Sequence, residues 1–493
     1  MNKNYKFILI PFLATLILGI TSCGTWHGTK RQSTTPKEVQ ILAVNDIHAA
    51  LDQFPRFAFM VDSIRQIYPN LILLSGGDNQ TGNPVNDQYH QKGMPIVMLM
   101  NKLGFDLSAL GNHEYDVSGA QMAKNFEASD FDYICANAQY KDDSHPLKKN
   151  KIITLPNGLK LGFSSLLYIN STGYPDCHPD NTIGFKFLDA NLVAQQQIAE
   201  LRDKVDILIF LNHVGFDEDV KLANLLPKGQ VDLIIGGHSH TKIDDEQYHN
   251  GTLITQAASK LAYASLIKIN VLGNEKQYHY ELMPIDSRGS EKVEIRELVD
   301  KLTRESGMDT PIAKTEKGIY SKEHLGYMMA DSQRAFADAD VAIVNPGGVR
   351  ISKIAAGEIT KKDIYTLDPF GNEIIVFEMT GKELQEMLTN AIALDGHSPL
   401  IPSGVHLKYI FEKSGEKESL KSIELLTDKG TPLDLEKNYR VVMNNYVATV
   451  YSFPKKETGK SLYETTANAT IQWLEKCGMA PEYSGVKRIE IIK

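Results

Sequence analysis

Short apolar runs, each followed at once by polar residues, recur through the first half of the chain. They cover residues 39–44, 71–74, 107–110, 205–211 and 231–235. Apolar runs of this length are typical of strands that are buried on both faces, as in parallel sheets. Between them lie stretches such as 57–68 and 191–204, which we interpret as crossover helices. The pattern predicts an α/β domain built on these strands.

The residues that directly follow these runs have side chains that can bind metal ions. Taken singly, each has an ordinary explanation that we would prefer: Asp46 or Asp78 as a helix cap, and His213 as a hydrogen-bonded core histidine. However, ligands gather beyond the carboxyl ends of strands in open α/β sheets, and five such coincidences favour one common site. That site would contain Asp46, His48, Asp78, Asn112, His213, His238 and His240.

This set of ligands indicates the kind of metal and the number of ions. Carboxylates, imidazoles and one amide, with no thiolate among them, suit hard to borderline divalent cations. Seven ligands are too many for one tetrahedral ion, but they suit two ions about 3.5–4 Å apart that share a bridging carboxylate. We therefore expect two divalent metal ions, and Zn, Mn, Mg and Co are all compatible with the sequence.

The segment 110–116 places an amide, an imidazole and two carboxylates within seven residues. Gly111 would let the backbone turn tightly after a strand, so that the following polar groups are aimed at one point. Taken alone, the segment is explained equally well by helix capping and by catalysis. Polar residues also follow the other apolar runs in the first half of the chain, and this repetition favours catalysis.

The second half of the chain predicts a linker helix and another domain. Single cores rarely grow beyond about 250–300 residues, so a chain of 493 residues is expected to divide. Ile295, Val299 and Leu302 form an apolar stripe with helical spacing, and Gly307 would end that helix. We expect a first domain at 37–286, a packed linker helix at 287–310 and a second domain at 311–493.

The N-terminus has the features of an export signal. Lys3 and Lys6 precede an apolar run at 7–20, which is shorter than the ~20 apolar residues that span a membrane. The small residues before Cys23 resemble the lipobox of bacterial lipoproteins, in which the cysteine carries lipid. An ordinary cleaved signal with a chance cysteine is the alternative, but the position of Cys23 favours lipidation. Residues 1–23 would be the signal with its lipidated cysteine, and 24–36 a flexible tether.

Charge and cysteine content exclude some classes of partner. The net charge of −9 argues against a surface for nucleic acid polymers, although metal ions can reverse the local field and admit a phosphate substrate. Besides Cys23 there are three scattered cysteines, too few for a disulfide framework. A bridge between Cys135 and Cys177 and two unpaired thiols are both open interpretations.

The order of these motifs resembles that of the calcineurin-like metallophosphatases, and downstream features narrow the resemblance to the bacterial 5′-nucleotidase/UDP-sugar hydrolase family. The resemblance runs from Val39 to the C-terminus. It implies an α/β fold of two domains: a metallophosphatase β-sandwich flanked by helices, and a C-terminal substrate-binding domain. It also implies that one metal is held by Asp46, His48 and His240, that the other is held by Asn112, His213 and His238, and that Asp78 bridges them. In that family the histidine equivalent to His113 stabilises the transition state and the aspartate equivalent to Asp116 orients it.

The resemblance extends to three stretches of the second domain. Residues 324–331 resemble a helix-opening motif near the substrate cleft, 345–350 a substrate loop, and 368–372 a stretch whose aromatic ring stacks on a nucleobase. The implied substrate-binding residues are Asn345, Gly347, Gly348, Arg350, Phe370 and Tyr446. The alternatives are a Gly-Gly turn with a solvated Arg350, and a Phe370 ring buried in the core.

Two features of the family pattern are absent from this chain. The family's Gly-Gly-Asp-Gly motif, whose aspartate holds ribose hydroxyls, is missing after Tyr446. An arginine that often precedes the helix-opening motif is also missing, since Ile319, Tyr320 and Ser321 stand there. The chain therefore keeps the family's metal-binding motifs and departs from its pattern at two features of the second domain.

The sequence thus predicts an enzyme of the bacterial cell envelope, anchored to a membrane through its N-terminal lipid and facing the periplasm or the cell surface. It would hydrolyse small phosphate esters, with nucleoside 5′-monophosphates as the preferred substrates. A UDP-sugar (nucleotide diphosphate) or 2′,3′-cyclic phosphate hydrolase on the same scaffold is the alternative within the enzyme class. A non-catalytic surface binding protein is the alternative outside it, and the complete ligand set argues against it.

Overall fold

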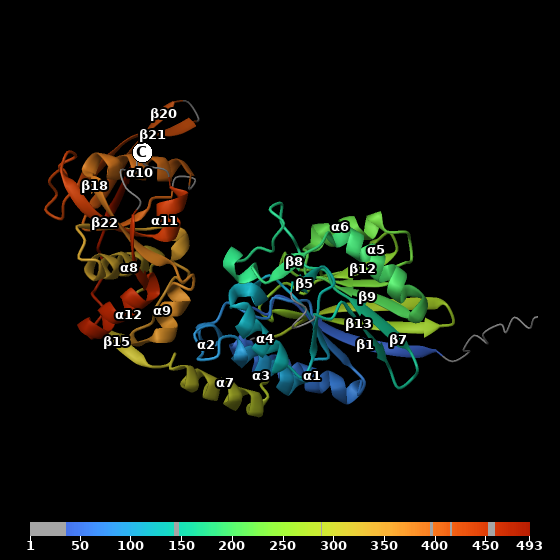
Figure 1. The fold of residues 1–493 in the computed structure, drawn as a ribbon. Helices are drawn as coiled ribbons and strands as arrows, with labels where there is room; N and C mark the ends of the chain where they lie inside the picture. Colours follow the sequence, from blue (N-terminus) through green and yellow to red (C-terminus); the bar gives the residue numbers. More distant parts are fainter. Residues whose placement is uncertain (1–35, 142–146, 287, 395–397, 415–416, 452–458) are drawn as a thin grey trace, which may run out of the picture.

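The computed structural model describes residues 36–141, 147–286, 288–394, 398–414, 417–451 and 459–493. The predicted signal segment with its Cys23, and the predicted tether up to residue 35, lie outside these ranges. Every helix within the described ranges is too short or too polar to cross a lipid bilayer. Two domains lie side by side and are connected through the helix α7 (Val293–Ser306) (Figure 1).

The N-terminal domain contains two mixed sheets of six strands each. The first has the order β14-β13-β1-β2-β3-β4, with the bounds Glu275–Pro284, Tyr263–Leu272, Lys37–Val44, Ile72–Ser75, Leu107–Ala109 and Asp132–Ile134. The second has the order β11-β12-β10-β9-β7-β6, with the bounds Gln247–His249, Thr252–Thr255, Leu233–Ile235, Ile207–Leu211, Lys160–Ser164 and Asn150–Thr154. All five predicted strands are present, three in the first sheet (β1, β2, β3) and two in the second (β9, β10).

The two sheets pack face to face, and the contact between them is the centre of the domain. In β1, Val39 and Ile41 point into this inter-sheet core, while Leu42 points to the opposite face. Helices cover both outer faces: α1 (Phe54–Ile67) and α3 (Met94–Leu103) over the first sheet, α5 (Ala190–Leu201) and α6 (Phe216–Leu225) over the second. Because the central strands are buried on both sides, strands such as β9 and β10 are apolar throughout. The predicted β-sandwich flanked by helices is confirmed.

The linker helix α7 packs against the N-terminal domain. Its apolar residues Ile295, Val299 and Leu302 are buried in the same cluster as α1 and α3. The helix ends at Gly307, whose φ of 67° is the left-handed conformation that glycine adopts at little cost. The predicted packed linker helix is therefore present, and α7 extends the first domain.

The C-terminal domain is also a mixed α/β structure. Its main sheet has the order β19-β16-β22-β18-β23, with the bounds Ile401–Ser403, Val341–Val344, Asn438–Asn444, Glu373–Thr380 and Lys460–Thr465. One face is covered by α8 (Lys322–Phe336), α9 (Lys361–Leu367) and α12 (Thr466–Cys477), and the other by α10 (Gly381–Leu394) with the strands β20 (His406–Ser414) and β21 (Lys417–Leu426). A capping box begins α10: Glu383 accepts from the Thr380 N–H, and Thr380 accepts from the Glu383 N–H.

The cysteines in the described ranges are free thiols. Cys135 is buried and Cys177 is partly buried. Burial raises the pKa of the Cys135 thiol to about 12, which keeps it protonated at neutral pH. Of the two open interpretations, the structure has the unpaired thiols.

Candidate metal centre

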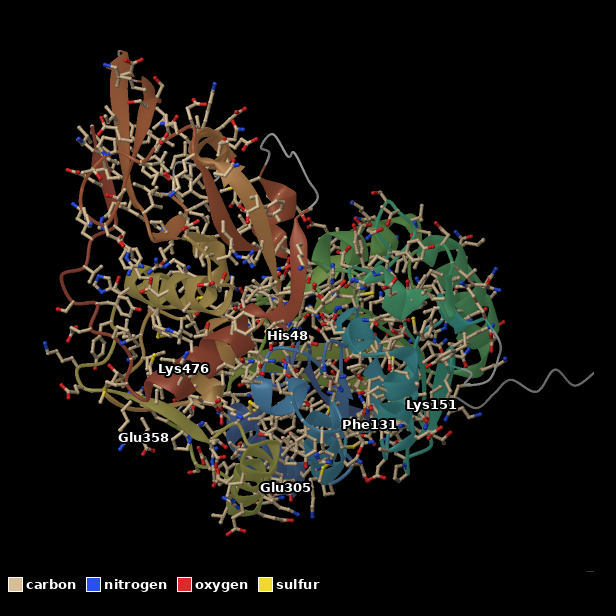
Figure 2. The ribbon with its side chains drawn as sticks, turned by 60° about the vertical axis from the view of Figure 1, so that its left-hand side comes forward. His48, Phe131, Lys151, Glu305, Glu358 and Lys476 are labelled. Atoms are coloured by element: carbon tan, nitrogen blue, oxygen red, sulfur yellow. The ribbon has the colours of Figure 1, made fainter. Side chains whose placement is uncertain are left out.

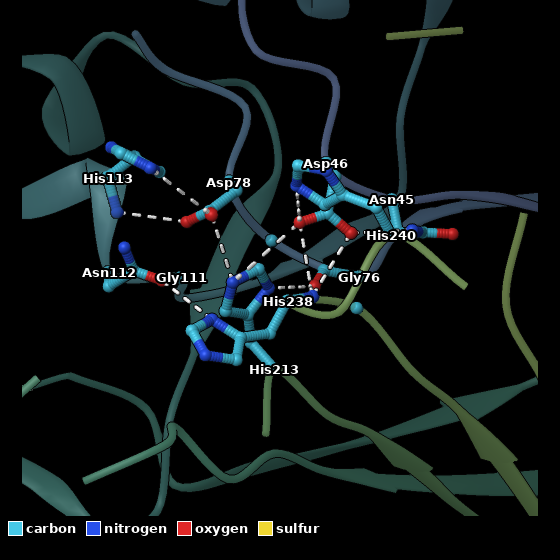
Figure 3. A network of polar contacts seen from close by, with 12 residues as sticks. Asn45, Asp46, Gly76, Asp78, Gly111, Asn112, His113, His213, His238 and His240 are labelled. Atoms are coloured by element: carbon cyan, nitrogen blue, oxygen red, sulfur yellow. Dashed lines mark hydrogen bonds and ion pairs between the residues drawn. The ribbon is translucent and has the colours of Figure 1, made fainter. Parts of the chain in front are cut away.

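The seven predicted metal ligands come together at the carboxyl ends of β1, β2, β3, β9 and β10. Ligand atoms of Asp46, His48 and His240 lie within 4.8 Å of one another, as do those of Asp78, His213 and His238. The seventh ligand, Asn112, has its Oδ1 3.0 Å from Nδ1 of His238. Figure 3 shows six of these side chains around one point: Asp46, Asp78, Asn112, His213, His238 and His240. His48 lies on the side of the domain that faces the C-terminal domain (Figure 2).

Most of these ligands have a strained backbone. Asp46, His48, Asp78, His238 and His240 all have φ between 47° and 77°, a region that residues with a Cβ rarely adopt. Hydrogen bonds between neighbouring loops hold this conformation, since Asp46 N–H donates to the Gly77 carbonyl and His48 N–H to the Asp78 carbonyl, each over 2.9 Å. Strain of this kind concentrates at functional sites, where the surroundings fix it.

Two histidines are oriented so that Nε2 is left for a metal ion. Nδ1 of His213 is 2.7 Å from the Gly76 carbonyl, and Nδ1 of His48 is 3.1 Å from the Thr81 carbonyl. A carbonyl oxygen accepts only when Nδ1 carries the proton. In the neutral imidazole, which is the form that binds a metal ion, Nε2 then carries the lone pair. Nε2 of His213 is buried and makes no hydrogen bond, although it lies 3.0 Å from a carboxylate oxygen of Asp78. A buried lone pair facing a carboxylate fits a divalent cation between them.

The carboxylates of Asp46 and Asp78 are buried. Burial alone would raise the pKa of Asp78, but His213, His113 and His48 around it hold that pKa well below its usual range. Buried carboxylates beside imidazoles are a favourable environment for cations. Together with the histidine orientation, the donor set fits two divalent metal ions.

His113 lies beside this cluster and is held by Asp116. Its Nδ1 is 2.6 Å from Oδ2 of Asp116, and its Nε2 is 4.0 Å from Oδ2 of Asp78. Burial lowers the pKa of His113, but the hydrogen bond to Asp116 and the charge of Asp78 outweigh it and raise that pKa to about 9. His113 can therefore carry a proton at neutral pH and present it from Nε2.

Glu114 supports the ligands, a role that the sequence analysis did not assign. Its buried carboxylate accepts from the N–H groups of Asp78, Asn79 and Gly111, over 3.2, 2.8 and 2.7 Å. It therefore ties the loop after β2 to the loop after β3. Its place in the segment 110–116 was the available signal, but its donating partners are backbone N–H groups, which leave no trace in a sequence.

The structure corrects the reason given for Gly111. Its φ is not among the positive values, so no left-handed turn requires glycine there. A Cβ at this position would instead lie 2.1 Å from Oδ1 and 2.4 Å from the backbone N of Asp78. Glycine is needed because the two ligand loops approach so closely.

The predicted substrate residues form a second group, in the C-terminal domain. The guanidinium of Arg350 lies over the Phe370 ring at 5.3 Å, and Phe370 and Tyr446 are 52% and 46% exposed. The alternative of a buried Phe370 ring is therefore wrong. The Glu373 N–H donates to Asn445 over 3.0 Å, which ties the strand after Phe370 to the helix that bears Tyr446.

The substrate loop belongs to the same group. Gly347 and Gly348 lie in the 3-10 turn Pro346–Gly348, and Asn345 before it accepts a hydrogen bond from Asn444 over 3.1 Å. Among the described residues, no hydrogen bond, ion pair or ring contact joins this second group to the metal ligands. The structure thus assembles two separate groups, one in each domain.

Comparisons with known proteins agree with this architecture. A model described as calcineurin-like phosphoesterase matches residues 39–242, and one described as 5′-nucleotidase, C-terminal domain matches residues 307–451. The 5′-nucleotidase of Vibrio cholerae is 28% identical, over 77% of this chain and 80% of its own length. The trifunctional nucleotide phosphoesterase protein YfkN of Bacillus subtilis is 26% identical over 91% of this chain, which spans 34% of that longer protein. The 5′-nucleotidase precursor of Thermus thermophilus has the same fold, with a TM-score of 0.65 at 24% identity, over 93% of this chain and 100% of that one.

Proposed function

This chain belongs to the 5′-nucleotidase family and is a metal-dependent phosphoesterase, and from that premise we propose that it hydrolyses nucleoside 5′-monophosphates to nucleoside and phosphate. The observation that carries the choice of substrate is the pair of exposed rings, Phe370 and Tyr446, with Arg350 beside the first. An aromatic pair offers the two faces of a nucleobase a place to stack. A guanidinium near it matches the charge of a phosphate.

We assign the metal ligands to two positions. Asp46, His48 and His240 would hold one ion, Asn112, His213 and His238 would hold the other, and Asp78 would serve as a ligand at both positions. When bound, two such ions neutralise the phosphate oxygens and make a water a stronger nucleophile. The buried carboxylates and the oriented histidines keep this site in one geometry before the ester arrives.

His113 acts on the leaving group in this proposal. Phosphate monoesters hydrolyse extremely slowly unaided, and an alkoxide leaves faster when it receives a proton. The raised pKa of His113 keeps the proton available, and Asp116 fixes the ring so that Nε2 is the donor.

A phosphate-release screen of the purified protein tests the proposal. The screen covers nucleoside monophosphates, a sugar phosphate, p-nitrophenyl phosphate, a UDP-sugar and a 2′,3′-cyclic nucleotide, each with Mn²⁺, Zn²⁺, Mg²⁺ or Co²⁺. Nucleoside 5′-monophosphates are expected to give the highest kcat/KM. A higher value for the UDP-sugar or the cyclic nucleotide would select that alternative instead. Because no aspartate stands where the family holds ribose, ribo- and deoxyribonucleotides should be hydrolysed alike.

Replacing Phe370 by alanine should weaken nucleotide substrates selectively. Stacking of a base on one aromatic ring contributes about 1–3 kcal/mol, so kcat/KM for a nucleoside monophosphate should fall about tenfold or more. A small sugar phosphate has no base, and its kcat/KM should hardly change. The measurement compares both substrates on wild type and variant at equal folded concentration.

Tyr463 provides the matched control for that variant, because it is another exposed ring of the same domain, at 90% exposed. Tyr463→Ala is expected to treat the two substrates alike. A uniform loss for Phe370→Ala on both substrates would contradict the base clamp and move the proposal towards a phosphate ester without a base.

We further propose that the protein is anchored to the bacterial envelope by lipid on Cys23. The support is the run of small residues before this cysteine, directly after the apolar segment. Cys23→Ser should therefore shift the protein from the membrane fraction to the soluble fraction of lysed cells. An unchanged distribution would point to an uncleaved signal or a tightly bound membrane partner.

A further inference from the structure

One surface loop contacts all three ligands of a single metal position. We call residues 168–176 the clamp loop; it lies between β7 and β8 (Phe185–Phe187) in the chain. The Tyr168 N–H donates to the His213 carbonyl over 2.8 Å, and the Tyr168 ring stacks on the His238 ring with centroids 5.0 Å apart. At the other end of the loop, the Asp176 carbonyl accepts from the side-chain amide of Asn112 over 3.0 Å.

The contact with Asn112 decides which way its amide faces. Because the NH₂ group donates to the Asp176 carbonyl, Oδ1 must point the other way, and it lies 3.0 Å from Nδ1 of His238. Only the oxygen of an amide can bind a metal ion. The clamp loop therefore selects the rotamer of Asn112 that is competent as a ligand.

The ligands of the other position have different supports. Among the described residues, the hydrogen bonds, ion pairs and ring contacts of the clamp loop reach none of Asp46, His48 and His240. Nδ1 of His48 is hydrogen-bonded to the Thr81 carbonyl, and the Asp46 N–H donates to the Gly77 carbonyl. The clamp loop thus supports the ligands of one position only, whereas the loop after β2 orients ligands of both positions.

Asn170 organises the clamp loop. Its Oδ1 accepts from the N–H and the hydroxyl of Thr172, over 2.9 and 2.6 Å, and its Nδ2 donates to Asp176 over 2.8 Å. Two backbone hydrogen bonds close the same turn, from the Asn170 N–H to the Tyr174 carbonyl and from the Gly173 N–H to the Asn170 carbonyl, each over 2.9 Å. Beside this turn, a cavity of about 370 Å³ is lined by Tyr168, Asn170 and Gly173. The position of the Asp176 carbonyl therefore depends on the Asn170 side chain.

We propose that Asn170 is a positioning residue that sets the metal affinity of one position, the one held by Asn112, His213 and His238, and leaves the other unchanged. The inference rests on the two-position assignment of the proposed function. Removing a group that orients a metal ligand typically lowers metal affinity 10–100-fold. We expect Asn170→Ala to do this at one position only.

Titration of the metal-free protein with Mn²⁺ tests the proposal, with free Mn²⁺ followed by its electron paramagnetic resonance signal. His240→Ala weakens the first position and His238→Ala the second, so each provides a background in which one position dominates. Asn170→Ala should lower Mn²⁺ affinity at least about tenfold in the His240→Ala background and leave it unchanged in the His238→Ala background.

Two further variants keep the result interpretable. Asn157→Ala removes a comparable asparagine turn, which accepts from Leu159 N–H and donates to the Glu38 carbonyl, and it should change neither affinity. Tyr168→Leu removes the stack on His238 and should have the same one-sided effect as Asn170→Ala, so a folding failure of one variant leaves the other. Thermal unfolding of each variant reports whether it is folded.

Equal losses in both backgrounds, or no loss in either, would overturn the proposal. Wild type that binds fewer than two Mn²⁺ ions would overturn both this inference and the two-position assignment. A one-sided loss in a protein that releases no phosphate from any tested ester would support the clamp loop and contradict the proposed function.

Discussion

Asp78→Ala is expected to abolish both metal binding and phosphate release. Asp78 is the carboxylate shared by the two proposed positions, with Oδ2 3.0 Å from Nε2 of His213 and 4.0 Å from Nε2 of His113. Without Asp78, the site loses a carboxylate whose negative charge would offset the positive charge of the metal ions. Turnover should fall by more than about 10⁴-fold, because nucleophile activation and charge neutralisation are both lost with the metals.

Elemental analysis of the purified variant measures the first effect, and phosphate release measures the second. Asp132→Ala is the control. Asp132 lies on β4, away from the ligand loops, and its carboxylate pairs with Lys148 and Lys151. It should retain two ions and full activity. If Asp78→Ala also retained two ions per chain, Asp78 could not be the bridging ligand.

His113→Ala should show the opposite combination: normal metal content with low activity. His113 lies beside the cluster and is held by Asp116, so its loss removes no proposed ligand. The loss of a general acid typically costs about 10²–10⁴-fold, and it should be largest for esters whose alcohol leaves poorly. kcat for a nucleoside monophosphate and for p-nitrophenyl phosphate therefore gives the decisive comparison.

A smaller loss for p-nitrophenyl phosphate would support proton donation, because p-nitrophenolate leaves without a proton. Equal losses for the two substrates would mean that His113 stabilises the charge of the transferred phosphoryl group instead. Asp116→Asn should weaken activity in the same pattern as His113→Ala, since it leaves the ring without its anionic partner.

The strands were predictable because they are buried on both faces. Ile41 meets the second sheet while Leu42 meets the helices, so both faces of β1 are apolar and buried from Ile41 to Val44. The division into two sheets was not predictable from the runs themselves, because β9 and β10 have the same apolar pattern as β1 and β2. That division became available only through the resemblance to the family.

The candidate metal ligands could be named from the sequence because their side chains carry the chemistry and follow strands directly. The groups that orient them were not, because many are backbone carbonyls: Gly76 for His213, Thr81 for His48 and Asp176 for Asn112. Every residue has a backbone carbonyl, so the sequence does not show which carbonyl accepts a hydrogen bond from a ligand side chain. The folded path of the chain decides this. The same limit explains why the roles of Glu114 and Asn170 emerged only from the structure.

The association of Phe370 with Tyr446 shows the same limit in the second domain. Each ring was recognised in its own motif, but the hydrogen bond from Glu373 N–H to Asn445 that joins the two segments involves residues outside those motifs. Local sequence thus predicted the two rings, and tertiary structure brings their segments together.

Stepwise addition of Mn²⁺ to the metal-free protein, with phosphate release from a nucleoside 5′-monophosphate measured at each step, tests the central claim most directly. A dinuclear phosphoesterase should remain inactive until the second ion binds, and its activity should reach a plateau at two ions per chain. Full activity without metal, a plateau at one ion, or two bound ions with no phosphate release would contradict it.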